Sequence, residues 1–324
     1  MTRSETSLLP RIVVSRCLGF AATRYNGIML HDPWVERLKK ISECIDLCPE
    51  VEIGLGIPRD PIRIVLRQER RYLLQPSTGR DVTAEMEDYC QAASTKLVDI
   101  DGFILKGKSP SCGLYDTKFY QNDNPNVAGR NGGFFGQRIL EDFPGLPAED
   151  EGRLQNFRIR EHFFTRIFAN ARLRELQQHP TPDKLIKFHS YNKLLMMEYN
   201  QSKMRELGKL VAQAGTIPID ELVKTYVEGF RSAIAKLPGR TSVINVLMHA
   251  AGYFKNKISA PEKALILDTY DDYREGKVPL SVPMTLIRQL AVRFDETYLL
   301  DQTFFNPFPD DLIAISESGQ GIKR

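Results

Sequence analysis

The stretch VVSRCLG at residues 13–19 decides the fold of this chain, because a short apolar run ends there in a cysteine and a turn. Two later stretches repeat the arrangement, namely IDLCPE at residues 45–50 and ILKGKSPSCG at residues 104–113. Each apolar run is typical of a strand. In an open α/β sheet the carboxyl ends of parallel strands converge on one crevice. We therefore expect the three cysteines to meet at a single point, although they lie far apart in the sequence.

The segments around these stretches alternate between strand and helix. The predicted strands are residues 10–17, 44–48 and 101–105, and the predicted helices are residues 34–40 and a longer one that begins at Asp81. Strand, helix, strand, helix and strand in this order are typical of a parallel sheet. Residues 62–66 and 71–75 resemble a hairpin or an edge ribbon. The first part of the chain is therefore predicted to be an α/β domain with a mostly parallel sheet.

The pattern changes in the middle of the chain. Residues 122–136 are rich in Asn and Gly, which predicts a loop or lid, and residues 144–152 hold the Pro, Gly and acidic residues typical of a joint between domains. Beyond the joint, apolar residues recur with helical period, and caps or prolines begin the segments. The predicted helices are residues 154–178, 181–197, 201–214, 218–237, 241–255, 260–275 and 283–294. We therefore predict an α/β domain over residues 1–148 and an all-α domain over residues 149–324.

The composition is that of a globular protein with reduced thiols. At 324 residues the chain has room for about two domains of roughly 150 residues each. No stretch approaches the 18 or so apolar residues of a membrane span, and the start lacks the apolar segment of a secretory signal. Five cysteines are an odd number, which argues against a disulfide framework, and Cys44 and Cys90 fall on apolar faces expected in the core. We therefore expect a cytoplasmic protein with no membrane partner.

The formal net charge of +3 is concentrated in the second half of the chain. Residues 1–150 carry 19 basic and 21 acidic side chains, whereas the remainder carries 25 and 20. Cationic side chains that share a helix face with a stacking group are typical of RNA contacts. The residues predicted to bind RNA are Arg158, Arg160, Lys184, Lys187, His189, Tyr191 and Lys193. A solvated helix surface explains the same charges equally well.

Three dispersed cysteines favour an iron–sulfur cluster over a zinc ion. Structural zinc sites use four ligands that usually come as close Cys-x-x-Cys pairs, and the sequence has no such pair. A 4Fe-4S cluster fits better, because Cys17, Cys48 and Cys112 would hold three of its irons and leave one iron open. An open iron implies chemistry instead of electron storage. The alternative is that these cysteines are buried and inert, as many core cysteines are.

The same stretches resemble the signature motifs of the thiouracil desulfidase (TudS) family. The matching phrases are VSRCLG at residues 14–19, CPE at residues 48–50 with the following Gly-Leu and Pro-Arg-x-Pro, and KSPSCG at residues 108–113. This resemblance extends over residues 9–145. The later part is similar to the helical YbgA-type domain, with FHSYNK at residues 188–193 near its centre. The two-domain arrangement resembles the RudS group, which implies removal of sulfur from 4-thiouridine in transfer RNA.

The resemblance implies roles for individual residues. It implies that the three cysteines are the cluster ligands and that Glu50 and Ser109 are the catalytic acidic and hydroxyl positions. A soft thiocarbonyl sulfur would bind the open iron, and Glu50 would take the proton of the water that adds to the ring carbon. Ser109 could donate a hydrogen bond or relay a proton, and Lys108 could favour the thiolate state. Alternatively, the serines beside Pro110 close a tight turn and Glu50 is an ordinary helix-start carboxylate.

We therefore predict an iron–sulfur-dependent, non-redox desulfidase that converts 4-thiouridine in tRNA, or a related thiouracil, to uridine and releases hydrosulfide. The predicted substrate is tRNA or a thiolated nucleobase or nucleoside, and no obligate protein partner is expected. One alternative is a tRNA thiolation factor, which would need a phosphate-binding loop to activate a base with ATP. Another is a cluster-bearing regulator that binds RNA or senses redox state without turnover.

Overall fold

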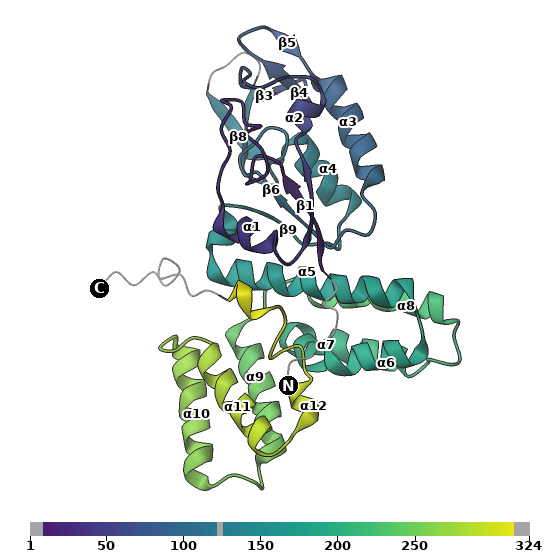
Figure 1. Ribbon diagram of the computed structural model, residues 1–324, viewed down its shortest axis with the longest axis vertical. Helices are drawn as coiled ribbons and strands as arrows, with labels where there is room; N and C mark the ends of the chain where they lie inside the picture. The colour runs from purple at the N-terminus through teal and green to yellow at the C-terminus, as the bar shows by residue number, and fades with distance from the viewer. Residues whose placement is uncertain (1–8, 122–125, 314–324) are drawn as a thin grey trace. The chain divides into compact units, whose positions relative to one another are not determined.

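The computed structural model describes residues 9–121 and 126–313 (Figure 1). The chain divides into two compact units by its internal contacts. The first unit runs to Arg174 and includes the stretch from Asp310, and the second unit is Glu175–Pro309. The predicted domain boundary between residues 148 and 149 stays a prediction.

A four-stranded parallel sheet lies in the first unit. Its strands, in the order β2, β1, β6, β9, are Glu43–Leu47, Arg11–Ser15, Gly102–Leu105 and Ala148–Asp150. The two central strands are the apolar ones, since β6 is buried throughout and β1 is buried except at its first residue. Near-continuous apolar runs are typical of strands that are covered on both faces. The predicted α/β domain with a mostly parallel sheet is confirmed.

Before α5, the first unit holds the helices α1 (Pro33–Leu38), α2 (Pro49–Glu52), α3 (Thr83–Lys96) and α4 (Phe134–Asp142). Asp32 caps α1, since its carboxylate accepts hydrogen bonds from two backbone N–H groups of the first turn at 2.9 and 3.1 Å. α3 and α4 lie side by side (Figure 1) and contribute Met86 and Phe135 to one core. That core also holds Val13 and Phe103 of the sheet.

A second, five-stranded sheet belongs to the same unit, and the sequence patterns predicted only its hairpin. Its strands, in the order β5, β4, β3, β7, β8, are Arg80–Asp81, Arg70–Gln75, Arg63–Arg67, Thr117–Gln121 and Val127–Asn131. β3 and β4 form the predicted hairpin as an antiparallel pair.

The prediction of a loop or lid over residues 122–136 is wrong where β8 and the start of α4 lie, and residues 122–125 are outside the described part. β8 was hidden by its Gly and polar residues. A Cβ atom at Gly129 would lie 2.4 Å from the ring of Phe119 on the paired strand β7, so a larger residue would force this ring to move. The glycine that suggested a loop therefore makes room for an aromatic side chain of the neighbouring strand.

Residues 144–152 also differ from the prediction, because they contribute the edge strand β9 instead of an irregular joint. Three residues are too few to show a periodicity, so this strand has no signal of its own in the sequence. After β9 the short 3-10 helix η1 (Arg153–Gln155) leads into the long helix α5 (Phe157–Gln178).

The second unit is helical, as predicted. Its helices are α6 (Pro182–Tyr191), α7 (Lys193–Val211), α8 (Ile219–Ala233), α9 (Arg240–Ala251), α10 (Ala260–Glu275), α11 (Ser281–Arg293), α12 (Thr297–Leu300) and the short 3-10 helix η2 (Gly252–Phe254), whereas η3 (Asp310–Leu312) belongs to the first unit. The predicted helix 181–197 is interrupted at Asn192, whose side chain donates to the Phe188 carbonyl at 2.8 Å. α7 bends at Asn200, which has φ −157° and caps the following turn by accepting from the Lys203 N–H.

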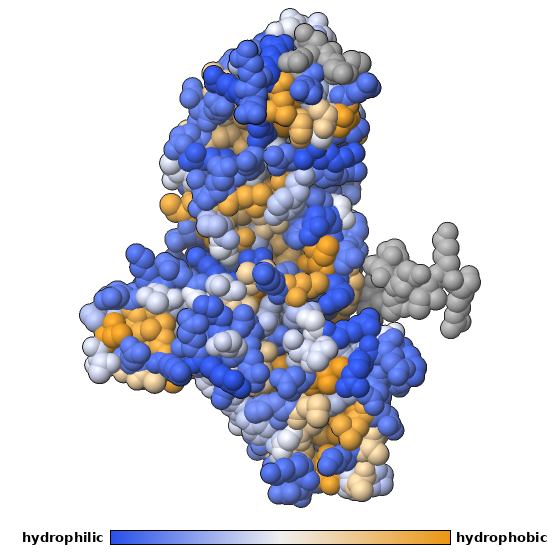
Figure 2. All heavy atoms as spheres, turned by 180° about the vertical axis from the view of Figure 1, so that it is seen from behind, coloured by the Kyte–Doolittle hydropathy of each residue, from blue (hydrophilic) through white to orange (hydrophobic). Residues whose placement is uncertain are grey.

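The apolar and polar residues separate as expected of a globular protein. Five aromatic residues of the helical segments are at most 4 % exposed, namely Phe163, Phe164, Phe168, Tyr226 and Phe230. Figure 2 shows a mainly hydrophilic surface on which hydrophobic residues form scattered patches. Within residues 9–121 and 126–313, no helix has both the length and the apolar character needed to cross a bilayer.

Candidate active site

The three predicted cysteines follow three neighbouring strands of the parallel sheet. Cys17 comes two residues after β1, Cys48 directly follows β2 and begins α2, and Cys112 lies in the turns after β6. Because β2, β1 and β6 are adjacent and parallel, their carboxyl ends share one edge of the sheet. All three are free thiols and are buried, with 8, 8 and 5 % of their surfaces exposed. The structure therefore gathers the three cysteines at one edge.

Cys48 is near enough to affect the pKa of Cys17, and both are near enough to affect the pKa of Cys112. Burial, and to a smaller extent Cys48, raises the pKa of Cys17 to about 11. Burial also raises the pKa of Cys112 well above its usual value; a hydrogen bond with Ser15 opposes this rise, and Cys48 and Cys17 add to it. Because metals bind thiolates, a cationic group held here would displace the thiol protons.

The donor set fits a cluster better than a single ion. In residues 9–121 and 126–313, no three His, Cys, Asp or Glu side chains converge closely enough to hold one metal ion. A polynuclear cluster distributes its thiolates over separate irons, so its ligands stand farther apart. Three neighbouring cysteines at one edge of the sheet therefore fit a metal–sulfur cluster better than a single metal ion.

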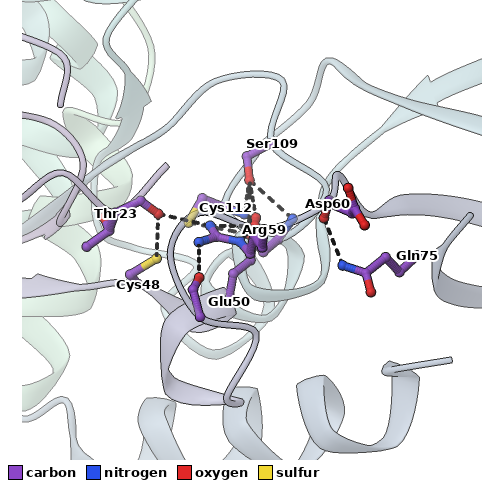
Figure 3. Close-up of polar contacts among 10 residues, drawn as sticks. Thr23, Cys48, Glu50, Arg59, Asp60, Gln75, Ser109 and Cys112 are labelled. Carbon is purple, nitrogen blue, oxygen red and sulfur yellow. Dashed lines mark hydrogen bonds and ion pairs between the residues drawn. The ribbon is translucent and has the colours of Figure 1, made fainter. Parts of the chain in front are cut away.

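A buried hydroxyl beside the cysteines supports this fit. The Oγ1 atom of Thr23 is buried and has no hydrogen-bond partner among the described residues. The carbonyl of Thr23 accepts a weak hydrogen bond from the Cys48 thiol at 3.9 Å, which places the two residues together (Figure 3). An unsatisfied buried hydroxyl is costly in a folded protein, so its position favours a polar or ionic partner at this point.

Glu50 forms a buried ion pair with Arg59 at the same edge (Figure 3). Glu50 lies in α2, two residues after Cys48, and its side chain is 12 % exposed, whereas that of Arg59 is 4 % exposed. Arg59 donates through Nε to Oε2 of Glu50 at 2.8 Å, and its Nη2 atom forms an ion pair with the same oxygen at 2.7 Å. Its guanidinium also donates to the carbonyls of Thr23 at 2.9 Å and Gly56 at 3.0 Å.

Two hydroxyl groups connect to the other oxygen of Glu50. Ser111 donates to Oε1 of Glu50 at 2.7 Å, and the Ser109 and Ser111 hydroxyls are 2.9 Å apart. Ser109 also accepts from the backbone N–H groups of Ser111 at 3.3 Å and Cys112 at 3.1 Å. The hydroxyl of Ser109 therefore closes a turn and also begins a chain of hydrogen bonds that ends on a carboxylate. A role of Ser109 in closing the turn is therefore compatible with a role in donating or relaying a proton.

Two cations, Lys106 and to a smaller extent Arg24, act on Cys17. Lys106 lowers the pKa of Cys17, whereas Glu151, with which Lys106 forms an ion pair, raises it. The backbone N–H of Gly107 also donates to Glu151 at 2.8 Å. Lys108 is exposed and has φ 62°, in the left-handed region. The predicted effect of Lys108 on the thiols stays a prediction.

The letters GFILKGKS at residues 102–109 also fit the Gly-x-x-x-x-Gly-Lys-Ser pattern of a phosphate-binding loop. Such a loop binds phosphate where it leads from a strand into a helix. Here residues 102–105 are strand β6 itself, turns and bends follow over residues 106–116, and β7 comes next. The pattern lacks its structural context, which weighs against a thiolation factor that activates a base with ATP.

Four polar residues described at the site were not among those predicted, namely Thr23, Arg59, Lys106 and Ser111. Arg59 had a signal, because it stands between two prolines directly after a Gly-rich turn. The sequence signal for Ser111 was its position directly before Cys112. Thr23 had no sequence signal, since its position depends on how the loop after β1 folds back over Cys48.

The residues predicted to bind RNA on α6 and at its end are partly exposed. Lys184, Lys187 and Lys193 are exposed, and the Lys187 ammonium lies 5.4 Å from the centre of the Tyr191 ring. His189 is half-buried, and its Nδ1 atom is 3.1 Å from the hydroxyl of the buried Tyr226. Burial, with a smaller effect of Lys193, lowers the pKa of His189. The lysines are accessible to a polyanion, whereas His189 has a packing role.

The two arginines predicted to bind RNA on α5 differ from each other. Arg158 is exposed in the first turn of the helix. Arg160 is 2 % exposed, lies 3.7 Å from the centre of the Trp34 ring and donates to the Leu154 carbonyl at 2.9 Å. The structure thus gives Arg160 a packing role in place of a surface for RNA.

Comparisons with known proteins cover both parts of the chain. Residues 12–151 match the 2-thiouracil desulfurase family, and residues 193–309 match a family described as a protein of unknown function (DUF1722). The uncharacterized protein YbgA of Escherichia coli (strain K12) is 30 % identical over 156 residues, which are 48 % of this chain and 92 % of YbgA. The uncharacterized protein YbbK of Bacillus subtilis (strain 168) is 33 % identical over 111 residues, 32 % of this chain and 72 % of YbbK.

The chain belongs to the 2-thiouracil desulfurase family and carries a DUF1722 region after it. A solved structure described as the [4Fe-4S]-dependent thiouracil desulfidase TudS is 28 % identical, with 45 % of this chain and 93 % of that chain covered and a TM-score of 0.37. The predicted resemblance to the desulfidase family, followed by a YbgA-type region, is confirmed. In this family member, the three cysteines and Glu50 all lie within the matched residues 12–151.

Proposed function

We propose that this desulfurase-family protein is an iron–sulfur-dependent, non-redox desulfidase that acts on a thiolated uracil, with 4-thiouridine in tRNA as its expected form. The observation that carries the proposal is the arrangement at one sheet edge of three buried, neighbouring thiols beside a buried carboxylate that ends a chain of serine hydroxyls. The family match supports the same reaction.

Cys17, Cys48 and Cys112 would hold a 4Fe-4S cluster and leave one iron without a protein ligand. When bound, such a cluster would supply a soft Lewis acid suited to a thiocarbonyl sulfur. Lys106 lies close enough to Cys17 to lower its pKa and would favour the thiolate form of that ligand.

The side chains of the protein would handle the water and its protons. A water molecule that donates to Ser109 could pass its proton through Ser109 and Ser111 to Glu50, because each hydroxyl of this chain already contacts the next group. The oxygen of the water forms a bond to the ring carbon while the carbon–sulfur bond breaks. Thione and water become carbonyl and hydrosulfide plus a proton, and no electrons are gained or lost.

The helical part would hold the RNA. The exposed cations on and next to α6, Lys184, Lys187 and Lys193, and the exposed Arg158 on α5 support this role. Lys187 over the Tyr191 ring combines a charge for phosphate with an aromatic face for a base. The predicted division of labour assigns the reaction to residues 1–148 and RNA binding to residues 149–324.

The test is anaerobic purification followed by an assay on tRNA that contains 4-thiouridine. We expect stoichiometric iron and acid-labile sulfide, and loss of the near-ultraviolet band of 4-thiouridine with release of hydrosulfide. Cys48→Ala should lack iron and activity, whereas Cys44→Ala, which changes a half-buried cysteine within β2, should keep both. Iron and RNA affinity without any desulfuration would instead indicate a regulator.

A further inference from the structure

Arg59 lies where three segments of the site meet, and the proposed chemistry does not yet use it. Its side chain is 4 % exposed, and a buried guanidinium is stabilised only when its donors are paired. Its described hydrogen bonds go to Glu50, to the carbonyl of Thr23 and to the carbonyl of Gly56. These acceptors lie on α2, on the loop after β1 and on the turn that precedes Arg59 itself.

The local sequence explains how Arg59 reaches Glu50, nine positions earlier. Gly54 and Gly56 have φ values of 80° and 74°, in the left-handed region that favours glycine. The chain therefore reverses after α2 and returns along it. The backbone N–H of Arg59 then donates to the Tyr25 carbonyl at 2.8 Å, so that the loop after β1 is held by both the backbone and the side chain of this residue.

The hydrogen bonds to Glu50 are asymmetric. Nε of Arg59 donates to Oε2, and Nη2 lies 2.7 Å from the same oxygen as its ion-pair partner. The other oxygen, Oε1, accepts from Ser111 at 2.7 Å and lies 3.5 Å from the hydroxyl of Ser109. A carboxylate that is fixed at one oxygen cannot rotate freely about its last bond, so the second oxygen keeps its direction toward the serines.

We propose that Arg59 is a positioning residue, which holds the Glu50 carboxylate in the orientation that accepts a proton from the serine chain. The inference rests on the proposed desulfidase function. Arginine suits this position because its planar guanidinium presents five donors in a fixed fork, and lysine has a single charged nitrogen. One arginine can therefore bind a carboxylate and two carbonyls of different segments at once, whereas a lysine could satisfy only part of this set.

The experiment compares Arg59→Met, Arg59→Lys and the control Arg80→Met in the anaerobically purified holoenzyme, with 4-thiouridine-containing tRNA as substrate. Arg80 is a suitable control because it forms an exposed ion pair with Glu85. We expect Arg59→Met to lower kcat roughly 100-fold, as misplaced catalytic groups do, with unchanged iron content and unchanged KM. Arg59→Lys should recover part of that loss, and Arg80→Met should match the wild type.

A double variant separates positioning from a general structural role. If Arg59 acts through Glu50, adding Arg59→Met to Glu50→Gln should lower kcat by less than threefold beyond Glu50→Gln alone, roughly the limit expected of coupled residues. Full activity of Arg59→Met, independent and multiplicative losses in the double variant, or loss of iron in both Arg59 variants would overturn the inference. A wild-type protein without desulfuration would instead reject the proposed function itself.

Discussion

The edge of the parallel sheet and the exposed face of α6 arrange their polar groups in opposite ways. At the sheet edge, Glu50 and Arg59 are buried and directed at other protein groups. On α6, Lys184 and Lys187 are exposed, and contacts such as Lys187 over the Tyr191 ring come from residues one helical turn apart. Fixed, buried groups suit bond-making chemistry because they need no reorganisation, whereas mobile cations suit a polyanion. Substitutions should therefore change rate in the first region and affinity in the second.

The largest effect is expected from the cysteines. Cys112→Ala should abolish both iron binding and desulfuration, because two remaining thiolates cannot hold a cluster that needs three. Iron analysis and the tRNA assay measure both quantities. Cys90→Ala is the matched control, since Cys90 is buried at 4 % exposure on α3, within the core. Wild-type iron content in Cys112→Ala would exclude Cys112 as a ligand.

The next effect tests whether the buried carboxylate acts in the reaction. Glu50→Gln keeps the shape of the side chain but cannot accept a proton, so kcat should fall about 1,000-fold. Iron content and the KM for tRNA should stay at wild-type values. Glu52→Gln, two residues later on α2 and ion-paired with Arg16, is the control and should remain active. Equal activity of the two variants would remove Glu50 from the mechanism.

The serine chain should have a smaller effect. Ser111→Ala removes the donor to Oε1 of Glu50, but Ser109 lies 3.5 Å from the same oxygen and can partly replace it. We expect kcat to fall about tenfold in Ser111→Ala and further in the Ser109→Ala, Ser111→Ala double variant. Single-turnover rates at saturating tRNA measure the difference. If the rate of Ser111→Ala equals that of the wild type, Ser111 takes no part in the proton relay, which would then consist of Ser109 and Glu50.

The helical region should respond in affinity alone. The double variant Lys184→Ala, Lys187→Ala should raise the KM for 4-thiouridine-containing tRNA about tenfold and flatten its salt dependence, because fewer counterions are released. Its kcat and its activity on the free nucleoside should not change. Lys263→Ala is the control, because Lys263 is an exposed lysine on α10, outside the predicted RNA-binding residues. If both variants bind tRNA alike, the RNA surface lies elsewhere.

The smallest effect is expected for the stability of the fold, through the carboxylate of Glu161, which lies outside both the sheet edge and α6. Burial raises the pKa of Glu161 on α5 to about 7, although Arg160 and Arg158 oppose the rise. Its folded-state pKa lies above its ordinary value, so the wild type loses stability as pH rises between these two values. Glu161→Gln should therefore raise the free energy of unfolding by about 2 kcal/mol near pH 8 and leave it unchanged near pH 4. Denaturant titrations at both pH values measure this, and an equal gain at both would point to packing instead of charge.

The sequence predicted the elements whose signals are local. Periodicity located most helices of the second unit, and apolar runs before Cys17, Cys48 and Cys112 located β1, β2 and β6. The capping residue Asp32 marks the start of α1, and the predicted hairpin is found as β3 and β4. What these elements share is that a few neighbouring residues decide their conformation.

The missed elements depend on distant partners. β8 looks like a loop until the ring of Phe119 on β7 explains the small residue at Gly129. β9 is a strand only because β6 offers it an edge. In the site, motif phrases pointed to the cysteines, Glu50 and Ser109, but not to Arg59 as the partner of Glu50, because a contact across nine residues depends on how the turn between them folds.

The amino-acid sequence by itself determined the strands β1, β2 and β6, the β3–β4 hairpin, the positions of the three cysteines at strand ends and the helical nature of the second unit, since these follow from short-range pattern. Only the tertiary structure decided that Cys48 lies close enough to affect the pKa of Cys17 and of Cys112, that Arg59 holds one oxygen of Glu50 and that Ser111 holds the other. Those contacts join residues far apart in the chain, and they form only when the packing of the sheet edge brings the loops together.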